Sequence, residues 1–469
     1  MKARLALMIA TGLFAAVGCL ADILTDSNLL SFSANPRDMI VCYSNGLSYG
    51  TTVGGGNLGQ GVIFRISANW TLTNLFLFSG TNGQLPYGGL VLGNDGNFYG
   101  TTEAGGASED PCEQLGTIFK ISPDGNFASL FSFQGTNGCQ PMSRLTSGSD
   151  GNLYGTTWQG GPDYQPDYYP YNYGYGVIFK VSTNGCFTFL ASFNRTNGFR
   201  PMGALLEVTN GVFYGAASAG GPFDDGTIYQ VTAAGGLTTV AVFDGTNGSS
   251  PQAGLTRGQD GCLYGTTYGG GASNAASGAA QGTVFTLRNG TIRTLCTFLG
   301  TGDIGANPDA GVIQGTDGNL YGTTLIGGLY DFGTIYRATT RGMLTTLYSF
   351  HDDFALPLDD GAFPYGNLMQ TPDGYFYGIC GGGGRTGAGT LYCFPMPPTI
   401  DNFELRSNSR FLQWNSVSNG IYQVQCTANI SCGSWSNMGG SITATNFNCS
   451  AIDVSPEAQA KFYRVLLLQ

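Results

Sequence analysis

Residues 86–102 of the chain read PYGGLVLGNDGNFYGTT, and residues 116–133 read GTIFKISPDGNFASLFSF. Together they hold four short apolar or alternating segments, and turn residues separate these segments. An Asp-Gly step suits a tight hairpin because glycine adopts a positive φ without steric cost. The stretch therefore predicts one antiparallel sheet of four short strands.

The same pattern recurs seven times along the chain. Its first marker is Tyr-Gly, which begins at Tyr49, Tyr99, Tyr154, Tyr214, Tyr264, Tyr321 and Tyr377. A second marker, Gly-(Thr/Val)-(Ile/Val/Leu)-(Phe/Tyr), follows each Tyr-Gly and begins at Gly61, Gly116, Gly176, Gly226, Gly282, Gly333 and Gly389. A repeat of about 40 to 60 residues is typical of propellers and solenoids.

The order of segments in each unit resembles a propeller blade of the NHL type. The predicted inner strands start near Met39, Pro86, Pro141, Pro201, Pro251, Pro308 and Pro364. The seventh unit lacks an outer strand of its own, and residues 28–32 (NLLSF) match the missing segment. We therefore predict an all-β, seven-bladed β-propeller over residues 28–394 that its N-terminal strand closes, which removes the open sheet edges.

The combined pattern of Tyr-Gly-Thr-Thr, Gly-Gly, Gly-Thr-Ile-Phe and Asp-Gly-Asn resembles the GloVer tandem repeat of bacterial "choice-of-anchor" proteins. The resemblance covers roughly residues 28–394. It implies an exported protein associated with the cell surface, and it carries over no catalytic residues. The C-terminal sorting signal that is frequent in this family is not seen in residues 461–469.

The pattern changes after residues 395–399, which we interpret as a proline-rich linker. Residues 400–469 contain alternating strands and predict a small β-sandwich of the fibronectin or immunoglobulin kind. Trp414 and Trp435 are expected in its core. Its three cysteines, Cys426, Cys432 and Cys449, allow at most one internal disulfide.

Residues 1–21 indicate a secretory signal peptide, because a basic start precedes a short apolar run. The alternative is a weak lipobox ending at Cys19, which would make the protein a lipoprotein. Both interpretations place the protein outside the cytoplasm, either secreted or at the cell surface. No second apolar segment of 18 residues follows, so we expect no transmembrane segment.

Glycine accounts for 76 of the 469 residues and the formal net charge is −11. This charge argues against nucleic-acid binding, which needs a basic surface. The single histidine, His351, excludes mechanisms that need two imidazoles. We expect a monomer, no cofactor and no metal site.

The longest loop between second and third strands supplies the candidate ligand-binding residues Trp158, Tyr164, Tyr168, Tyr169, Tyr171, Tyr173 and Tyr175. Tyrosine and tryptophan present flat surfaces with hydrogen-bonding edges, which suit sugars and protein partners. The alternative is that the loop packs over its own blade.

Two acidic patterns are candidates for cation sites. The aspartates of the Asp-Gly steps are better explained as turn residues than as calcium ligands. His351, Asp352, Asp353, Asp359 and Asp360 form the densest acidic cluster. A solvated surface loop is favoured over a cation site there.

Two disulfides are proposed from topology alone. Cys380 and Cys393 lie on neighbouring predicted strands of the last blade. Cys112 and Cys139 lie in loops on one face.

The sequence favours an exported, non-catalytic propeller that serves as a surface binding module, with a glycan or a surface protein as its partner. One alternative is a secreted carbohydrate-active hydrolase or lyase. The other is a purely structural cell-surface protein. No catalytic residue is predicted.

Overall fold

The computed structural model describes residues 28–37, 41–42, 46–107, 115–165, 174–272, 280–301, 303–351, 360–372, 374–398, 400–406, 409–416, 420–427, 435–444, 448–454 and 462–468. Within these ranges every regular element is a β-strand, and the sheets are antiparallel. None of the described residues forms a helix that could cross a membrane. The prediction of an all-β protein is confirmed.

The described part of the repeat region contains seven four-stranded sheets, each made largely of consecutive strands. The first three are β2 (Val41–Cys42), β3 (Ser48–Thr52), β4 (Val62–Ile66) and β5 (Leu72–Leu77); β6 (Leu90–Leu92), β7 (Phe98–Thr102), β8 (Thr117–Ile121) and β9 (Phe127–Ser132); and β10 (Thr146–Ser147), β11 (Leu153–Thr156), β12 (Val177–Val181) and β13 (Phe187–Ser192). The next three are β14 (Leu206–Thr209), β15 (Val212–Ala217), β16 (Thr227–Thr232) and β17 (Leu237–Val242); β18 (Thr256–Arg257), β19 (Leu263–Thr267), β20 (Thr283–Arg288) and β21 (Thr291–Thr297); and β23 (Ile313–Gln314), β24 (Leu320–Thr324), β26 (Thr334–Ala338) and β27 (Leu344–Ser349). A short extra pair joins β22 (Gly305–Ala306) and β25 (Ile326–Gly327).

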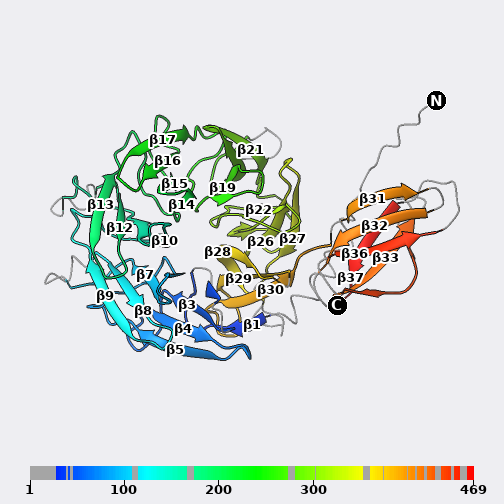
Figure 1. Ribbon diagram of the computed structural model, residues 1–469, viewed down its shortest axis with the longest axis horizontal. Helices are drawn as coiled ribbons and strands as arrows, with labels where there is room; N and C mark the ends of the chain where they lie inside the picture. Colours follow the sequence, from blue (N-terminus) through cyan, green and yellow to red (C-terminus); the bar gives the residue numbers. More distant parts are fainter. Residues whose placement is uncertain are drawn as a thin grey trace.

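The seventh sheet combines the two ends of the repeat region. It contains β28 (Ala362–Gln370), β29 (Tyr375–Gly382) and β30 (Thr390–Pro395), and β1 (Asn28–Ser31) pairs with β30. The Phe32 N–H donates to the Gly389 carbonyl at 3.0 Å. Figure 1 shows the seven sheets arranged around a common centre, with β10 and β14 closer to it than β13 and β17.

The glycine of each Tyr-Gly step lies directly opposite the aromatic residue of the third strand. The seven pairs are Gly50 with Phe64, Gly100 with Phe119, Gly155 with Phe179, Gly215 with Tyr229, Gly265 with Phe285, Gly322 with Tyr336 and Gly378 with Tyr392. A Cβ on any of these glycines would clash with the ring of its partner. The two sequence markers are therefore the two halves of one contact, in which the aromatic ring covers the glycine.

The glycine that opens the second marker contacts the next repeat. Each has a positive φ, and its Cβ would clash with the proline that leads the following segment. The seven contacts are Gly61 with Pro86, Gly116 with Pro141, Gly176 with Pro201, Gly226 with Pro251, Gly282 with Pro308, Gly333 with Pro364 and Gly389 with Pro36. The last one links the seventh sheet to the segment that precedes the first.

The aspartates of the Asp-Gly steps are turn residues. Asp150 accepts hydrogen bonds from the Asn152 N–H at 3.0 Å and from the Tyr154 hydroxyl at 2.8 Å. The same two bonds recur at Asp95, Asp260 and Asp317. At these four positions the turn interpretation is confirmed, because the carboxylates are used within their own hairpin. Asp373 lies outside the described residues.

Residues 400–468 form two further sheets beside the propeller (Figure 1). One contains β31 (Ile400–Arg406), β32 (Ser409–Asn415) and β36 (Asn448–Asp453); the other contains β33 (Ile421–Thr427), β34 (Ser436–Asn437), β35 (Ile442–Thr443) and β37 (Phe462–Leu467). Trp414 is fully buried between them, as expected. The expectation of a core position is wrong for Trp435, which is only partly buried and has the Arg464 guanidinium over its ring at 4.5 Å.

The acidic cluster near His351 differs from its prediction at Asp360. This residue is 1% exposed, and its carboxylate accepts a hydrogen bond from the Tyr348 hydroxyl. The His351 Nδ1 lies 3.0 Å from Asp360 Oδ1. A solvated loop is therefore wrong for Asp360, because the last sheet buries it. The other three aspartates of the cluster lie outside the described residues.

We predict that Gly155→Ala destabilises the protein. The new Cβ would lie 2.6 Å from the Phe179 ring and 2.7 Å from Leu145, so these packed side chains must shift. Overpacking of this kind costs about 1–3 kcal/mol. Chemical denaturation should show a matching loss in the free energy of unfolding. Gly54→Ala is the control, because no atom lies within 4 Å of its Cβ position. An equal effect in both variants would contradict the packing argument.

We predict a pH-dependent stability term from Asp360. Burial raises the pKa of Asp360 to about 6. The hydrogen bond from Tyr348 and the charge of His351 lower this pKa and only partly offset the effect of burial. In the unfolded chain the pKa of an aspartate is about 3.9. The folded state therefore favours the protonated form, and this stabilisation is complete below about pH 4 and is lost as the pH rises through 6. The loss amounts to about 3 kcal/mol.

Asp360→Asn removes this titration. The difference in unfolding free energy between wild type and Asp360→Asn should thus change between pH 4 and pH 7, with wild type losing stability. The same pair of measurements in a His351→Gln background separates the carboxyl from the imidazole. A difference that stays constant with pH would contradict the prediction.

Candidate functional site

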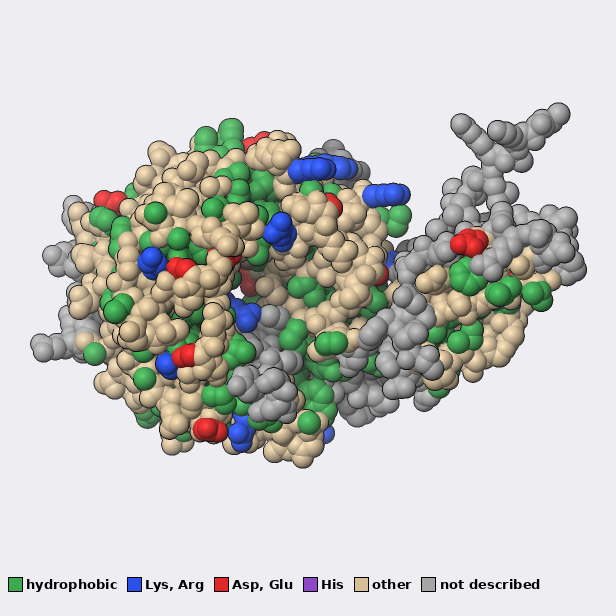
Figure 2. Space-filling view, viewed as in Figure 1, with side chains coloured by type: hydrophobic (Ala, Val, Ile, Leu, Met, Phe, Trp, Pro, Cys, Tyr) green, Lys and Arg blue, Asp and Glu red, His purple; other side chains and the backbone are tan. Residues whose placement is uncertain are grey.

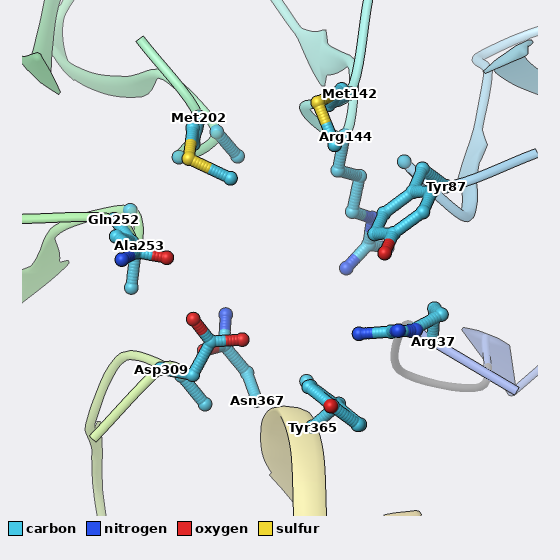
Figure 3. A pocket seen from close by; sticks show the side chains of 16 residues that line it. Arg37, Tyr87, Met142, Arg144, Met202, Gln252, Ala253, Asp309, Tyr365 and Asn367 are labelled. Atoms are coloured by element: carbon cyan, nitrogen blue, oxygen red, sulfur yellow. The ribbon is translucent and has the colours of Figure 1, made fainter. Parts of the chain in front are cut away.

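The residues that follow the seven repeat prolines converge on one cavity. They are Arg37, Tyr87, Met142, Met202, Gln252, Asp309 and Tyr365. Every one of these prolines is buried, and every residue after it is partly exposed. The cavity has a volume of about 190 Å³. Figure 2 shows the propeller face hollowed near its centre, and Figure 3 shows these side chains around the hollow.

The backbone before each proline is held in an unusual conformation. Six of the seven preceding residues have a positive φ between 53° and 57°, namely Leu85, Gln140, Arg200, Ser250, Asn307 and Phe363. Such a conformation costs about 1–3 kcal/mol at a non-glycine residue and persists only where its surroundings determine it. The repeat supplies those surroundings at every one of the six.

Two backbone hydrogen bonds determine this conformation. The Leu85 N–H donates to the Gln60 carbonyl of the preceding sheet at 2.9 Å, and the Leu85 carbonyl accepts from the Glu103 N–H at 2.9 Å. The N–H bond to the preceding sheet recurs at all six positions. The residue after the proline is thus placed by a rigid backbone, whatever its own side chain is.

A second set of residues, three positions after the proline, completes the cavity wall. It comprises Arg144, Ala204, Gly254 and Asn367. The Asn367 Oδ1 accepts from the Gly311 N–H at 2.7 Å, which fixes the amide at the wall. The small residues leave the central space open on their side.

Arg37 is held between two tyrosine rings. Its guanidinium carbon lies 3.9 Å from the centre of the Tyr365 ring and 5.0 Å from that of Tyr87. The Arg37 Nε is buried and forms no hydrogen bond to the described residues. Cation–π contacts with the two rings orient the plane of the guanidinium, which lines the cavity.

The acidic groups near Arg37 have raised pKa values. Burial raises the pKa of Asp309, and the charge of Arg37 opposes this shift. Burial likewise raises the pKa of Glu103, again against Arg37. The pKa of Tyr87 is also raised, and burial is the largest cause. The site therefore combines cationic, acidic, amide and aromatic groups in one concave space, as small-molecule sites do.

Three of the sequence-predicted loop residues are described, and none lines this cavity. Trp158 lies under the Arg200 guanidinium at 5.0 Å, and its Nε1 is buried without a hydrogen bond to the described residues. Tyr164 packs on Gly135, and Tyr175 packs edge-on against Phe199 at 5.7 Å. Ligand binding by this loop stays a prediction. Tyr168, Tyr169, Tyr171 and Tyr173 lie outside the described residues.

The proposed disulfide between Cys380 and Cys393 is wrong. Cys380 pairs with Thr390, and Cys393 pairs with Tyr377, so the two cysteines are three positions out of register. That offset separates them by about 10 Å along the strands and places them on opposite faces of the sheet. Cys139 is buried, and burial raises the pKa of its thiol to about 12. Its proposed partner Cys112 lies outside the described residues.

Within the described ranges no group of three or more His, Cys, Asp or Glu residues could hold a metal ion. Sequence patterns alone do not identify the seven cavity residues that follow the repeat prolines, which are called the axial residues from here on. The sequence does contain a signal for them: the proline recurs from repeat to repeat, but the residue after it varies. The sequence pattern does not identify Pro36-Arg37, because it predicts the start of the first inner strand near Met39.

Comparisons with solved structures give weak likenesses. A gluconolactonase from Xanthomonas campestris is 11% identical, with 78% of this chain and 87% of that chain covered and a TM-score of 0.37. The PQQ-bound aldose sugar dehydrogenase from Streptomyces coelicolor is 14% identical, with 78% and 96% covered and a TM-score of 0.38. A puromycin hydrolase mutant is 11% identical, with 84% and 60% covered and a TM-score of 0.46. Values this low carry nothing about the activity of this chain.

No curated protein matches the chain. The family model of the Gloeobacter/Verrucomicrobia repeat matches residues 22–166 and 275–409, which is more than half of the sequence. These two segments include five of the seven Tyr-Gly steps, among them Tyr99 and Tyr321. The predicted resemblance to this repeat is confirmed, and the chain belongs to the Gloeobacter/Verrucomicrobia repeat family.

Proposed function

We propose that the protein is a ligand-binding protein built on a seven-bladed β-propeller that the N-terminal strand closes. Seven repeat-derived sheets among the described residues support the blade number. The pairing of β1 with β30 and the contact of Gly389 with Pro36 support the closure. We further propose that the ligand occupies the cavity at the axis.

The observation that carries this proposal is the composition of the seven positions after the repeat prolines. The Tyr-Gly glycine, by contrast, is the same residue in all seven repeats, because packing requires it. The axial position instead holds arginine, tyrosine, methionine, glutamine and aspartate. Convergent polar and aromatic groups in a concave site are typical of ligand binding.

Binding is favoured over catalysis by the acidic groups of the cavity. Asp309 is the only carboxylate among the described residues that line it. Glycoside hydrolysis normally uses a pair of carboxyl groups that flank the bond to be cleaved. His351, the single histidine of the chain, does not line the cavity.

The second candidate function is a hydrolase or lyase that acts on the same ligand. The raised pKa of Asp309 favours it, because a carboxyl group with a raised pKa can serve as a general acid or base. Only a measurement of turnover separates this candidate from simple binding.

The remaining features of the proposal follow from the sequence. We propose that residues 1–21 direct export and that the protein acts outside the cytoplasm, either secreted or retained at the surface. The extracellular partner is a glycan or a surface protein, and residues 400–469 form an accessory β-sandwich after the linker 395–399.

We predict that Tyr87→Ala weakens ligand binding about tenfold, because it removes an aromatic wall of the cavity worth about 1.4 kcal/mol. Calorimetric titration of the full chain against a panel of monosaccharides and their acids measures this directly. Phe223→Ala is the matched control, since Phe223 is 60% exposed and lies outside the cavity.

The same samples are assayed for product by mass spectrometry. Saturable binding without product, weakened in Tyr87→Ala alone, is the expected result. Product formation would establish the second candidate instead. Equal affinity in Tyr87→Ala and wild type would show that the ligand does not bind in the axial cavity.

A further inference from the structure

We infer that the ligand of the axial cavity is an acidic monosaccharide, a uronic acid whose carboxylate binds between Arg37 and Arg144. This inference rests on the proposed function and adds the chemical class of the ligand. It stands on two guanidinium groups that reach one small cavity from neighbouring walls (Figure 3).

Arg37 supplies the first guanidinium. The Tyr365 ring covers one face of it, so its hydrogen-bonding edge is the part left for a ligand. No described carboxylate forms an ion pair with Arg37, although Asp309 and Glu103 are each close enough for the charge of Arg37 to act on their pKa values. The planar fork of a guanidinium matches the two oxygens of a carboxylate.

Arg144 supplies the second guanidinium. Its Nε donates to the Leu90 carbonyl at 2.8 Å, which anchors the side chain against the neighbouring sheet. The rest of the guanidinium points to the centre of the cavity (Figure 3). Arg144 likewise forms no ion pair with a described residue. The anchored stem reduces the entropy lost when a ligand binds.

The wall opposite the arginines suits hydroxyl groups. Gln252, Asp309 and Asn367 lie on this side (Figure 3), and amide and carboxyl groups form hydrogen bonds with hydroxyls. A sugar ring carries several hydroxyls and an apolar face, which the tyrosine ring of Tyr87 can cover.

The size of the cavity limits the ligand to one ring. Its volume of about 190 Å³ lies below the roughly 300–1,000 Å³ of pockets for drug-sized molecules. The cavity therefore suits a free uronic acid or the terminal uronic acid of a chain.

A singly charged carboxylate fits better than a phosphate. Asp309 faces the two arginines from across the cavity, and Glu103 lies near Arg37. These acids oppose a second negative charge, and a phosphate monoester carries about −1.5 to −2 at neutral pH. One carboxylate adds only one charge to this group.

The test titrates the full chain by calorimetry with D-glucuronate, D-galacturonate, D-glucose, D-galactose and inorganic phosphate. At least one uronate should bind tenfold or more tightly than its neutral sugar and than phosphate. Arg144→Gln should weaken uronate binding at least tenfold and change neutral-sugar binding less than threefold. Arg37→Lys, which keeps the charge but removes the fork, should also weaken uronate binding and serves if Arg144→Gln does not fold.

Arg195→Gln is the matched control, because Arg195 is a surface residue paired with Asp224 at 3.2 Å. Neutral sugars that bind as tightly as uronates would overturn the inference and leave the proposed function standing. Phosphate that binds more tightly than uronate would also overturn it. Absence of any binding would overturn the proposed function itself. A short oligosaccharide with a terminal uronate, compared with the free acid, separates the two sources of the ligand.

Discussion

The repeat depends on one contact, in which an aromatic ring of the third strand lies over the glycine opposite it on the second strand. The contact occurs in all seven sheets, from Gly50 with Phe64 to Gly378 with Tyr392. Only glycine leaves room for the ring, and only an aromatic ring fills the space that glycine leaves. The tyrosine beside the glycine projects to the other face of the sheet, because side chains alternate along a strand, and in four repeats its hydroxyl binds the turn aspartate. The Tyr-Gly dipeptide therefore contacts the third strand through its glycine and the hairpin turn through its tyrosine.

A second constraint fixes the backbone around the repeat prolines, next to the central cavity. The Gly-Thr glycine of one repeat contacts the leading proline of the next, and the residue before that proline is bonded to the preceding sheet. The backbone at the proline is thus determined from both sides, and a strained φ is tolerated six times. Because packing does not depend on the side chain after the proline, that position is free to vary. Function can then differ from one member of such a repeat family to another without any change in the scaffold.

The charge of the site differs from that of the whole chain. The protein carries a formal net charge of −11, yet two of its 19 basic residues meet at the axis. Arg37 is stacked between tyrosines, and Arg144 is anchored by a backbone carbonyl. Cations placed in an enclosed site interact with a bound anion more strongly than surface cations do, since water and salt screen them less. An acidic protein can in this way bind an acidic ligand.

The sequence by itself determined the strand class, the seven Tyr-Gly repeats, the Asp-Gly turns, the burial of Trp414 and the membership of the repeat family. All of these follow from local patterns, in which residues close along the chain meet each other. Tertiary structure decided the axial site, because residues such as Arg37 and Asp309 are far apart in sequence and meet only when the sheets surround a centre. It also decided the register that separates Cys380 from Cys393 and the burial of Asp360. Register and burial depend on how neighbouring strands and sheets are placed, and composition alone does not carry that information.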